Sequence, residues 1–359
     1  MATLVLAGGG TAGHIEPALA VARAWKIAHP DDVIVFIGTK SGLENRLVPS
    51  AGFTLAHIPK VTVSRRPSFS WIQIPFHLYR AVASSRVVLK DAQLLIGFGG
   101  YVSAPAYLAA RLGKTPFLIH EANAKPGWAN RLGAKLTPYL AVANPIDKGG
   151  FGKALITGLP LRSDVSQAFL ASRSDFQTAR SAAKARLGFN ESKPLIFIMG
   201  GSQGSVAINK VIEASLSKLL EKDISILHSV GKANALPMQV SGYRPVSYVD
   251  SMGDAYLASD LVISRSGAVT CSEFRALGRY ALFVPLPIGN GEQLYNARAL
   301  IEASKAEVVE QTDFDAQYLV KHIDELLKKS AASPVEGSDA DLAAAEKIVA
   351  FGEFAMSDK

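Results

Sequence analysis

Three glycine-containing turns in this 359-residue sequence are placed where they could bind phosphate groups. Each follows a short apolar run and precedes a predicted helix: Gly8-Gly9-Gly10-Thr11-Ala12-Gly13-His14, Gly200-Gly201-Ser202-Gln203-Gly204, and the stretch from Ser264 through Gly267 to Glu273. Glycine lets the backbone turn tightly and approach a ligand, and the free N–H groups at a helix N-terminus attract anions. The turns therefore predict anion binding. Because they lie in both halves of the chain, they suit a ligand held in a cleft between two domains.

The first turn by itself leaves several functions open. Gly8, Gly10 and Gly13 fit the G-x-G-x-x-G pattern of dinucleotide-binding proteins. That pattern also requires an acidic residue about 20 positions on, after the second strand, to hold a ribose. Here the second apolar run ends Ile37-Gly38-Thr39-Lys40, without a carboxylate, although Lys40 could hold the phosphate of NADP. An NAD(P)-dependent oxidoreductase and a tight turn that holds no ligand both remain alternatives.

Polar side chains near the third turn could bind the rest of a nucleotide sugar. Glu273 stands one turn into the predicted helix, where it could accept two ribose hydroxyls while the backbone amides of 268–270 meet a diphosphate. The alternative is that Glu273 only complements the helix dipole. The Pro- and Gly-rich loop 285–296 ends in amides and a carboxylate that could bind sugar hydroxyls, or that could simply cap the loop.

The elements that position these turns alternate between strand and helix in both halves of the sequence. Short apolar runs separated by helices are typical of a parallel sheet covered on both faces, so we expect an α/β fold with two doubly wound units. A polar helical segment at 163–190 joins the halves, and an Ala-rich helix closes the chain. The expected strands are 3–7, 33–37, 94–97, 116–119, 140–143, 194–199, 224–229, 247–249, 260–264 and 281–285. Helices are expected between them, for example at 17–27 and 102–112, the first of them beginning at Pro17.

Composition excludes several classes of protein. With 48% hydrophobic and 19% charged residues, the chain is neither disordered nor collagen-like. The single cysteine, Cys271, excludes an intramolecular disulfide framework and a Cys-rich zinc site, and favours a reducing, cytosolic environment. No run reaches the roughly 18 apolar residues of a membrane-spanning helix. The apolar N-terminus carries no basic residue and leads directly into glycines, which predicts a first strand and not a signal peptide.

Charge is distributed unevenly, and this suggests an anionic partner for one half. Residues 1–160 carry a net charge of +10, whereas the remainder carries −3. The segment 45–90 contains no acidic residue, and its aromatic residues stand beside Lys and Arg at helical spacing. This pattern favours contact of the 60–90 region with an anionic membrane surface. Binding to nucleic acid is the other explanation of the charge, but the sequence contains no recognisable nucleic-acid-binding motif. The alternative is that the apolar face is the packed face that any helix of such a domain needs.

Taken together, the motifs resemble those of the MurG-type family of lipid-linked UDP-N-acetylglucosamine transferases in peptidoglycan synthesis. The resemblance spans nearly the whole chain, in order. It rests on 11–14 (Thr-Ala-Gly-His), 99–103 (Gly-Gly-Tyr-Val-Ser), 120–123 (His-Glu-Ala-Asn), 160–162 (Pro-Leu-Arg), 200–204, 265–273 and 293–297 (Gln-Leu-Tyr-Asn-Ala). Three positions depart from the family pattern: Ala12 replaces a glycine, Leu159 an asparagine, and Glu292 a glutamine that would reach the sugar.

The resemblance implies a GT-B fold, with two Rossmann-like domains facing a cleft. Residues 1–162 would form the acceptor- and membrane-facing domain, residues 163–338 the UDP-GlcNAc-binding domain, and the helix at 339–359 would pack back on the first. By analogy with the family, Val249 would contact the uracil and Glu273 would bind the ribose. Ser202 and the amides of 268–270 would bind the diphosphate, and Gln293 would bind the sugar. The full binding set implied is Thr11, Ala12, Gly13, Asn123, Arg162, Ser202, Val249, Ala268, Val269, Thr270, Cys271, Ser272, Glu273 and Gln293.

The resemblance also implies a reaction, which is transfer of GlcNAc from UDP with inversion to the C4 hydroxyl of a lipid-linked muramyl pentapeptide. The enzyme, a hexosyltransferase, would work peripherally at the cytoplasmic face of the membrane. Helix N-termini and Arg162 would meet the charge of the departing UDP, so no metal or cofactor is expected. His14 is the first candidate for the base, with His120 or Glu121 as runners-up. A UDP-GlcNAc 2-epimerase of the same fold is the main rival.

Overall fold

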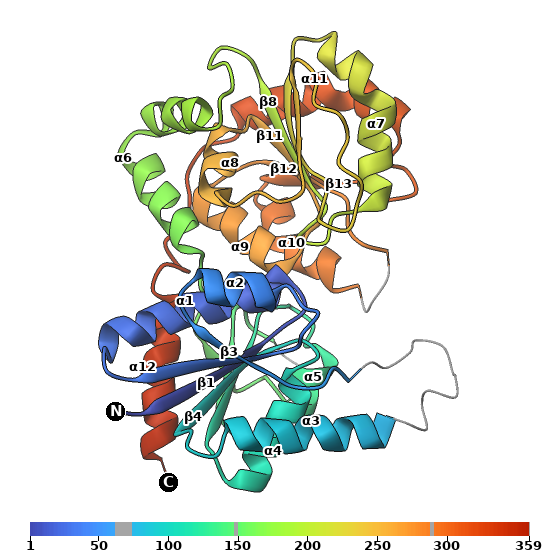
Figure 1. Ribbon diagram of the computed structural model, residues 1–359. Helices are drawn as coiled ribbons and strands as arrows, with labels where there is room; N and C mark the ends of the chain where they lie inside the picture. Colours follow the sequence, from blue (N-terminus) through green and yellow to red (C-terminus); the bar gives the residue numbers. More distant parts are fainter. Residues whose placement is uncertain (62–73, 147–149, 288–290, 359) are drawn as a thin grey trace. The chain divides into compact units, whose positions relative to one another are not determined.

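Parallel strands form the centre of both halves of the computed structural model, which describes residues 1–61, 74–146, 150–287 and 291–358. The chain divides into two compact units. Unit 1 comprises Met1–Arg162 together with Ala340–Lys359, and unit 2 comprises Ser163–Asp339. In each unit a twisted sheet lies between helices (Figure 1). This is the two-domain α/β architecture of the GT-B fold that the motifs implied.

The sheet of unit 1 has the strand order β3-β2-β1-β4-β5-β6-β7, and every neighbouring pair is parallel. Since the order reverses between β1 and β4, the loops that follow these two strands depart to opposite sides and leave room for a ligand at that edge. The strands are β1 (Thr3–Gly8), β2 (Val33–Gly38), β3 (Thr54–His57), β4 (Leu94–Gly99), β5 (Phe117–Glu121), β6 (Leu140–Val142) and β7 (Leu155–Ile156).

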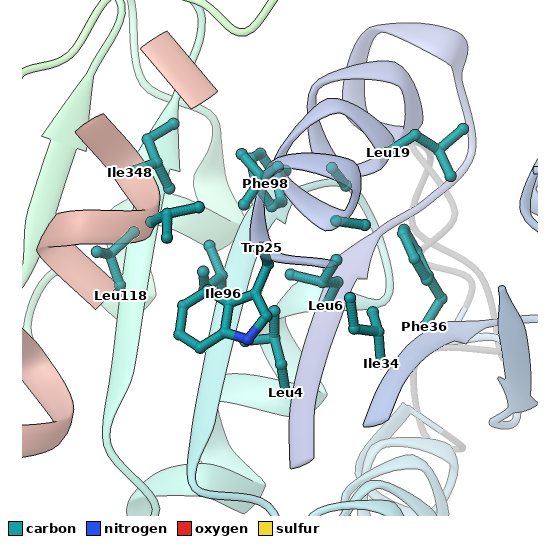
Figure 2. Close-up of a cluster of buried hydrophobic side chains, with 14 of the residues drawn as sticks. Leu4, Leu6, Leu19, Trp25, Ile34, Phe36, Ile96, Phe98, Leu118 and Ile348 are labelled. Carbon is teal, nitrogen blue, oxygen red and sulfur yellow. The ribbon is translucent and has the colours of Figure 1, made fainter. Parts of the chain in front are cut away.

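Helices cover both faces of this sheet and bury its apolar side chains. They are α1 (Ala12–Ala28), α2 (Glu44–Ser50), α3 (Ile74–Val88), α4 (Ser103–Gly113), α5 (Trp128–Gly133) and the C-terminal α12 (Ala344–Ser357). On one face Trp25 of α1 is fully buried, and Figure 2 shows it among Leu4, Ile96 and Ile348. Because Ile348 belongs to α12, the last helix of the chain completes the core of the first unit.

The sheet of unit 2 has the order β10-β9-β8-β11-β12-β13, again parallel throughout, with its reversal between β8 and β11. Its strands are β8 (Leu195–Met199), β9 (Ser225–Ser229), β10 (Tyr243–Val246), β11 (Leu261–Ser264), β12 (Ala281–Phe283) and β13 (Ala306–Val308). Its helices are α6 (Ser163–Arg186), α7 (Val206–Leu220), α8 (Met252–Ala258), α9 (Ala268–Leu277), α10 (Glu292–Glu302) and α11 (Ala316–Ala332). No helix in the described part of the chain is long and apolar enough to cross a membrane.

Several local predictions were wrong in position. The strand expected at 247–249 lies earlier, at Tyr243–Val246, where Pro245 is tolerated because β10 is an edge strand. The first helix begins within the glycine turn, at Ala12, and not at Pro17, which lies inside it. His120 and Glu121 belong to the end of β5 and do not follow it. The short edge strands β3 and β7 and the edge strand β13 were not anticipated.

A buried histidine holds the strands of unit 2 together and makes its stability depend on pH. His228 of β9 is 1% exposed, and burial lowers its pKa to about 4. Its Nδ1 lies 2.9 Å from the Tyr243 hydroxyl and its Nε2 lies 3.1 Å from the amide oxygen of Asn209. Asn209 donates its own amide nitrogen to the Val230 carbonyl at 2.9 Å, which fixes that oxygen toward the ring. His228 is therefore neutral, with its proton on Nε2.

We predict that His228→Gln reduces the sensitivity of unit 2 to acid. Because the folded pKa lies below the usual value near 6.5, the unfolded chain binds more protons between pH 6.5 and 4. The stability from a neutral His228 is thus complete above pH 6.5 and is lost as the pH falls toward 4. At about 1.4 kcal/mol per pKa unit, moving from pH 7 to 5 costs about 2 kcal/mol. Denaturant unfolding at a series of pH values should show this loss in the wild type and in the control His57→Gln, an exposed position, but not in His228→Gln. Equal slopes in all three would contradict the assignment.

Candidate functional site

The carboxyl edge of the unit 2 sheet brings two of the glycine turns side by side. Ser264 at the end of β11 pairs with Met199 at the end of β8, so the turns that follow them start from neighbouring positions at the strand reversal. This strand reversal is the place in a doubly wound sheet where ligands bind. The turn after β8 also packs on the turn after β9: a Cβ at Gly204, where φ is +77°, would lie 2.0 Å from the Val230 carbonyl oxygen, so only glycine fits.

A buried guanidinium lies under these turns. Arg265 is 7% exposed and donates to four neutral acceptors: the carbonyls of Val284 and Pro285 at 2.8 and 2.9 Å, the Ser205 hydroxyl at 2.8 Å and the Gln311 amide oxygen at 2.6 Å. Burial lowers its pKa, yet a guanidinium keeps its charge in proteins. The side chain therefore ties the loops after β8, β12 and β13 together and leaves a positive charge at the edge where an anion would bind. The motif was noticed in the sequence, but this role of Arg265 was not.

The N-terminus of α9 fits the predicted contacts to a diphosphate. Gly267 precedes the helix and makes no side-chain cap, so no side chain of that residue competes for the amides of the first turn. The first three helical residues, 268–270, are half-buried, whereas Cys271 and Ser272 are buried. Burial raises the pKa of the Cys271 thiol, which keeps it protonated. Cys271 and Ser272 therefore help to pack the helix.

The other predicted residues of unit 2 lie within α9, in loops that follow strands at the same edge, or at the start of α10. Glu273 is 2% exposed and its Oε2 accepts the Tyr256 hydroxyl at 2.6 Å, a partner that sequence reasoning missed. Val249 is buried in the connection between β10 and α8, and Ser202 lies half-buried in the glycine turn. The Gln293 amide oxygen accepts the Leu286 N–H at 2.9 Å, so the amide nitrogen is the group that Gln293 can offer to a sugar.

In unit 1 the turns after β1 and β4 interlock residue by residue. A Cβ on Gly99 would lie 3.3 Å from the His14 ring, and one on Gly100 would lie 2.3 Å from the Gly9 carbonyl oxygen. Next in the chain, the Tyr101 ring is so near Gly10 that a Cβ there would approach it to 2.7 Å. Both Gly99 and Gly100 have positive φ, of 89° and 83°. The position of His14 therefore depends on this interlocking of the two turns.

His14 lies at the start of α1 with its ring against the backbone of Gly99. Its Nδ1 is 3.2 Å from the Thr11 hydroxyl, which stands at the N-cap of the helix. Burial lowers the pKa of His14, and a hydrogen bond with the Gly9 backbone opposes this effect in part. The imidazole is thus neutral near pH 7, which is the state a general base requires. Ala12 and Gly13, also predicted to bind substrate, are half-buried in the same first turn.

Glu121 is fully occupied by hydrogen bonds. It is 2% exposed; its Oε1 accepts the backbone and side-chain amides of Asn123 at 2.9 and 3.1 Å, and its Oε2 accepts the Gly127 N–H at 2.9 Å and the Asn130 amide at 3.0 Å. Burial raises its pKa, and these hydrogen bonds lower it in part. The carboxylate thereby holds the loop between β5 and α5 and orients Asn123.

His120 is 1% exposed and faces the interior of unit 1. Its Nε2 lies 2.9 Å from the Gly158 carbonyl oxygen, and burial lowers its pKa to about 4. Its ring contacts Phe98 at a centroid distance of 5.8 Å. This geometry suits a packing role. Arg162, the last residue of the first segment of unit 1, pairs with Glu16 of α1 at 3.3 Å, close in sequence to His14.

The exposed face of α3 carries part of the predicted membrane surface. Phe76 and Tyr79 are 60% and 71% exposed, and Val87, near the C-terminal end of the helix, is 76% exposed. The Arg80 guanidinium lies 5.7 Å from the centroid of the Phe76 ring. Ala81 and Ser85 on the opposite face are buried. The remainder of the predicted surface, residues 62–73, lies outside the described part of the chain.

Sequence comparison assigns both halves of the chain. Residues 4–144 match the glycosyltransferase family 28 N-terminal domain and residues 195–350 the family 28 C-terminal domain. A protein of Corynebacterium glutamicum (strain R) is 46% identical over 323 residues, which cover 88% of this chain and 87% of that protein. Its name is UDP-N-acetylglucosamine--N-acetylmuramyl-(pentapeptide) pyrophosphoryl-undecaprenol N-acetylglucosamine transferase.

Solved structures of similar fold support the same assignment. The crystal structure of MurG from Acinetobacter baumannii superposes with a TM-score of 0.69 at 26% identity, covering 99% of this chain and all of that one. A UDP-GlcNAc 2-epimerase from Neisseria meningitidis bound to UDP-GlcNAc gives a TM-score of 0.64 at 15% identity, covering 98% and 99% of the two chains. That second likeness is one of fold alone. The chain therefore belongs to glycosyltransferase family 28 and, within it, to the MurG-type N-acetylglucosamine transferases.

Proposed function

We propose that this protein transfers N-acetylglucosamine from UDP-N-acetylglucosamine to the C4 hydroxyl of undecaprenyl-diphospho-N-acetylmuramyl pentapeptide, with inversion. The 46% identity to a transferase with that named activity, over 88% of this chain, carries the proposal. The geometry of unit 2 supports it, because a nucleotide diphosphate needs helix N-terminal amides and positive charge, and both occur at the reversal of that sheet. An epimerase or an NAD(P)-dependent oxidoreductase has no comparable support.

Unit 2 is the proposed donor site. The amides of 268–270 and the Ser202 turn would bind the diphosphate, Glu273 the ribose, Val249 the uracil and Gln293 the sugar. As the glycosidic bond breaks, negative charge grows on the UDP oxygens. Donors already fixed in place stabilise such charge without reorganisation, and buried Arg265 adds a positive potential at the same edge. By the family resemblance, Arg162 is proposed to meet the same charge.

His14 is the proposed general base. A base must take the proton of the attacking hydroxyl, so it needs a neutral nitrogen within reach of the substrate. The lowered pKa of His14 and its half-buried position in the β1–α1 turn suit that task. His120 and Glu121 suit it less, because the first donates into the core and the second accepts four hydrogen bonds. We propose that these two residues position the loop that presents Asn123.

We propose that the enzyme is a peripheral protein on the cytoplasmic face of the cell membrane, and that unit 1 is its membrane-facing unit. An acceptor with a polyprenyl tail requires the enzyme to approach the lipid surface. The exposed Phe76, Tyr79 and Val87 on α3, with Arg80 beside them, are suited to shallow insertion among anionic headgroups. The net charge of +10 on residues 1–160 favours the same surface, and nucleic acid is not proposed as a partner.

The transfer reaction is tested by release of UDP from UDP-N-acetylglucosamine with and without the lipid-linked muramyl pentapeptide. We expect release only when the acceptor is present, together with a disaccharide product that contains the GlcNAc. A new UDP-sugar formed in the absence of acceptor would instead identify an epimerase. Oxidation or reduction of a nicotinamide cofactor would identify the oxidoreductase alternative.

We predict that His14→Ala lowers kcat by roughly 10²–10⁴-fold, the usual contribution of a general base, while UDP binding stays unchanged. The acid limb of the wild-type kcat/KM profile should have its midpoint below pH 6.5, because the lowered pKa keeps the imidazole neutral at lower pH. Steady-state kinetics and calorimetric titration with UDP measure both quantities, within the pH range where circular dichroism shows a folded protein. Near-normal turnover of the variant would remove His14 from this role.

We predict that the double substitution Phe76→Ser with Tyr79→Ser weakens binding to anionic vesicles roughly tenfold, because two exposed rings no longer insert. Co-sedimentation with vesicles of phosphatidylglycerol and phosphatidylcholine measures the partition. The matched control replaces Leu170 and Leu236, two exposed apolar residues of unit 2, by serine. The assignment would be contradicted if vesicle binding did not depend on the anionic lipid fraction and on the salt concentration, or if it fell equally in the control.

A further inference from the structure

A buried carboxylate lies at the centre of the interlocked turns of unit 1. Glu44, the first residue of α2, is fully buried, and it was not singled out from the sequence. Two glycines make room for it. A Cβ on Gly38 would lie 2.5 Å from the Glu44 Cγ, and one on Gly42 would lie 1.9 Å from its Oε2. The chain around Glu44 is thus built to admit this side chain.

Glu44 accepts hydrogen bonds from the turns that follow three strands. From the turn after β1, the Gly10 N–H donates to Oε2 at 3.1 Å. From the turn after β2, the N–H and hydroxyl of Thr39 donate to Oε1 at 3.0 and 3.3 Å. From the turn after β4, the Tyr101 hydroxyl donates to Oε1 at 2.8 Å. A buried carboxylate is tolerated only when such donors satisfy it, so the group and the three turns hold one another in place.

The same contacts link Glu44 to His14. Tyr101 and Gly10 are in van der Waals contact, and Glu44 binds the hydroxyl of the first and the amide of the second. Gly99, two residues before Tyr101, supports the His14 ring, and Gly9, next to Gly10, packs on Gly100. Burial raises the pKa of Tyr101 to about 12, so its hydroxyl remains a donor at neutral pH. If the carboxylate is lost, the two turns that hold His14 lose the group that joins them.

We infer that Glu44 is a positioning residue for the transfer reaction, and that its carboxylate fixes the β1–α1 turn so that His14 meets the acceptor hydroxyl. The inference rests on the proposed function. The inference also means that the Gly10 N–H is already bound to an anion of the protein itself, the Glu44 carboxylate. A phosphate would have to displace a buried negative charge to bind there, so this amide is closed to a phosphate group.

The decisive variants are Glu44→Gln and Glu44→Ala. Glutamine keeps the shape but offers one acceptor oxygen, and its NH2 group would face the N–H of Gly10 or of Thr39. We expect kcat to fall at least tenfold while the KM for UDP-N-acetylglucosamine and the affinity for UDP stay within twofold. Acetate, at tens of millimolar, should restore part of the turnover of Glu44→Ala and none of that of His14→Ala, because only the former lacks a carboxylate.

Asp32→Asn is the matched control. Asp32 lies at the opposite edge of the same sheet, where its oxygens accept the Ala2 N–H at 2.6 Å and the Trp25 indole N–H at 3.0 Å. Its loss should lower stability and leave kcat unchanged. Hydrogen exchange of the peptide that contains Gly10 should accelerate in Glu44→Gln and not in Asp32→Asn.

The outcomes separate the inference from the function on which it rests. If the wild type releases no UDP with acceptor present, the proposed function fails, and the exchange measurement alone still tests whether Glu44 fixes the turn. If the wild type is active and Glu44→Gln turns over normally, the inference is overturned. It is equally overturned if turnover, UDP affinity and the circular dichroism signal fall together, since Glu44 would then be a purely structural residue.

Discussion

A parallel sheet whose strand order reverses sends the loops after two neighbouring strands to opposite sides, and the rest of this structure depends on how the space between them is filled. Both units have this reversal, between β1 and β4 and between β8 and β11. In unit 1 the backbone of the turn after β4 fills part of this space, because a Cβ at Gly100 would collide with the Gly9 carbonyl oxygen. In unit 2 Gly204, in the turn after β8, packs equally closely on the Val230 carbonyl of the turn after β9. Neighbouring backbone amides are thereby concentrated at one edge of each sheet.

The two edges carry internal charges of opposite sign, and this difference separates two otherwise similar units. In unit 2 the buried group is the Arg265 guanidinium, bound to neutral oxygens. In unit 1 it is the Glu44 carboxylate, bound to neutral donors. Since a low-polarity interior strengthens the field of a buried charge, Arg265 favours an anion at the first edge, whereas Glu44 disfavours one at the Gly10 amide of the second. Such a division of labour is consistent with a donor diphosphate in unit 2 and a hydroxyl to be deprotonated in unit 1. The fold alone does not dictate it, because epimerases share the architecture.

A structural feature could be predicted from the sequence where the residues that produce it lie close together in the chain. Central strands such as β1, β4 and β8 are continuous apolar runs, and their glycine turns follow directly, so sequence was enough to find them. Edge strands such as β3, whose residues are all exposed or half-buried, carry little apolar signal. α1 was misplaced because Pro17 resembles a first helical residue, whereas the glycine turn itself starts the helix. Glu44 and Tyr256 could not be found, since their partners lie far away in sequence and only the folded chain brings them together.

The return of the C-terminus to unit 1 has a consequence for synthesis. Ile348 and Ala355 of α12 are fully buried in the core that contains Trp25, so residues 1–162 lack part of their own interior until α12 has been made. Unit 2, whose residues are consecutive in the chain, can finish folding earlier. The core of unit 1 must therefore wait for α12 to be synthesised before it is complete. During that interval it is the segment most in need of chaperone protection.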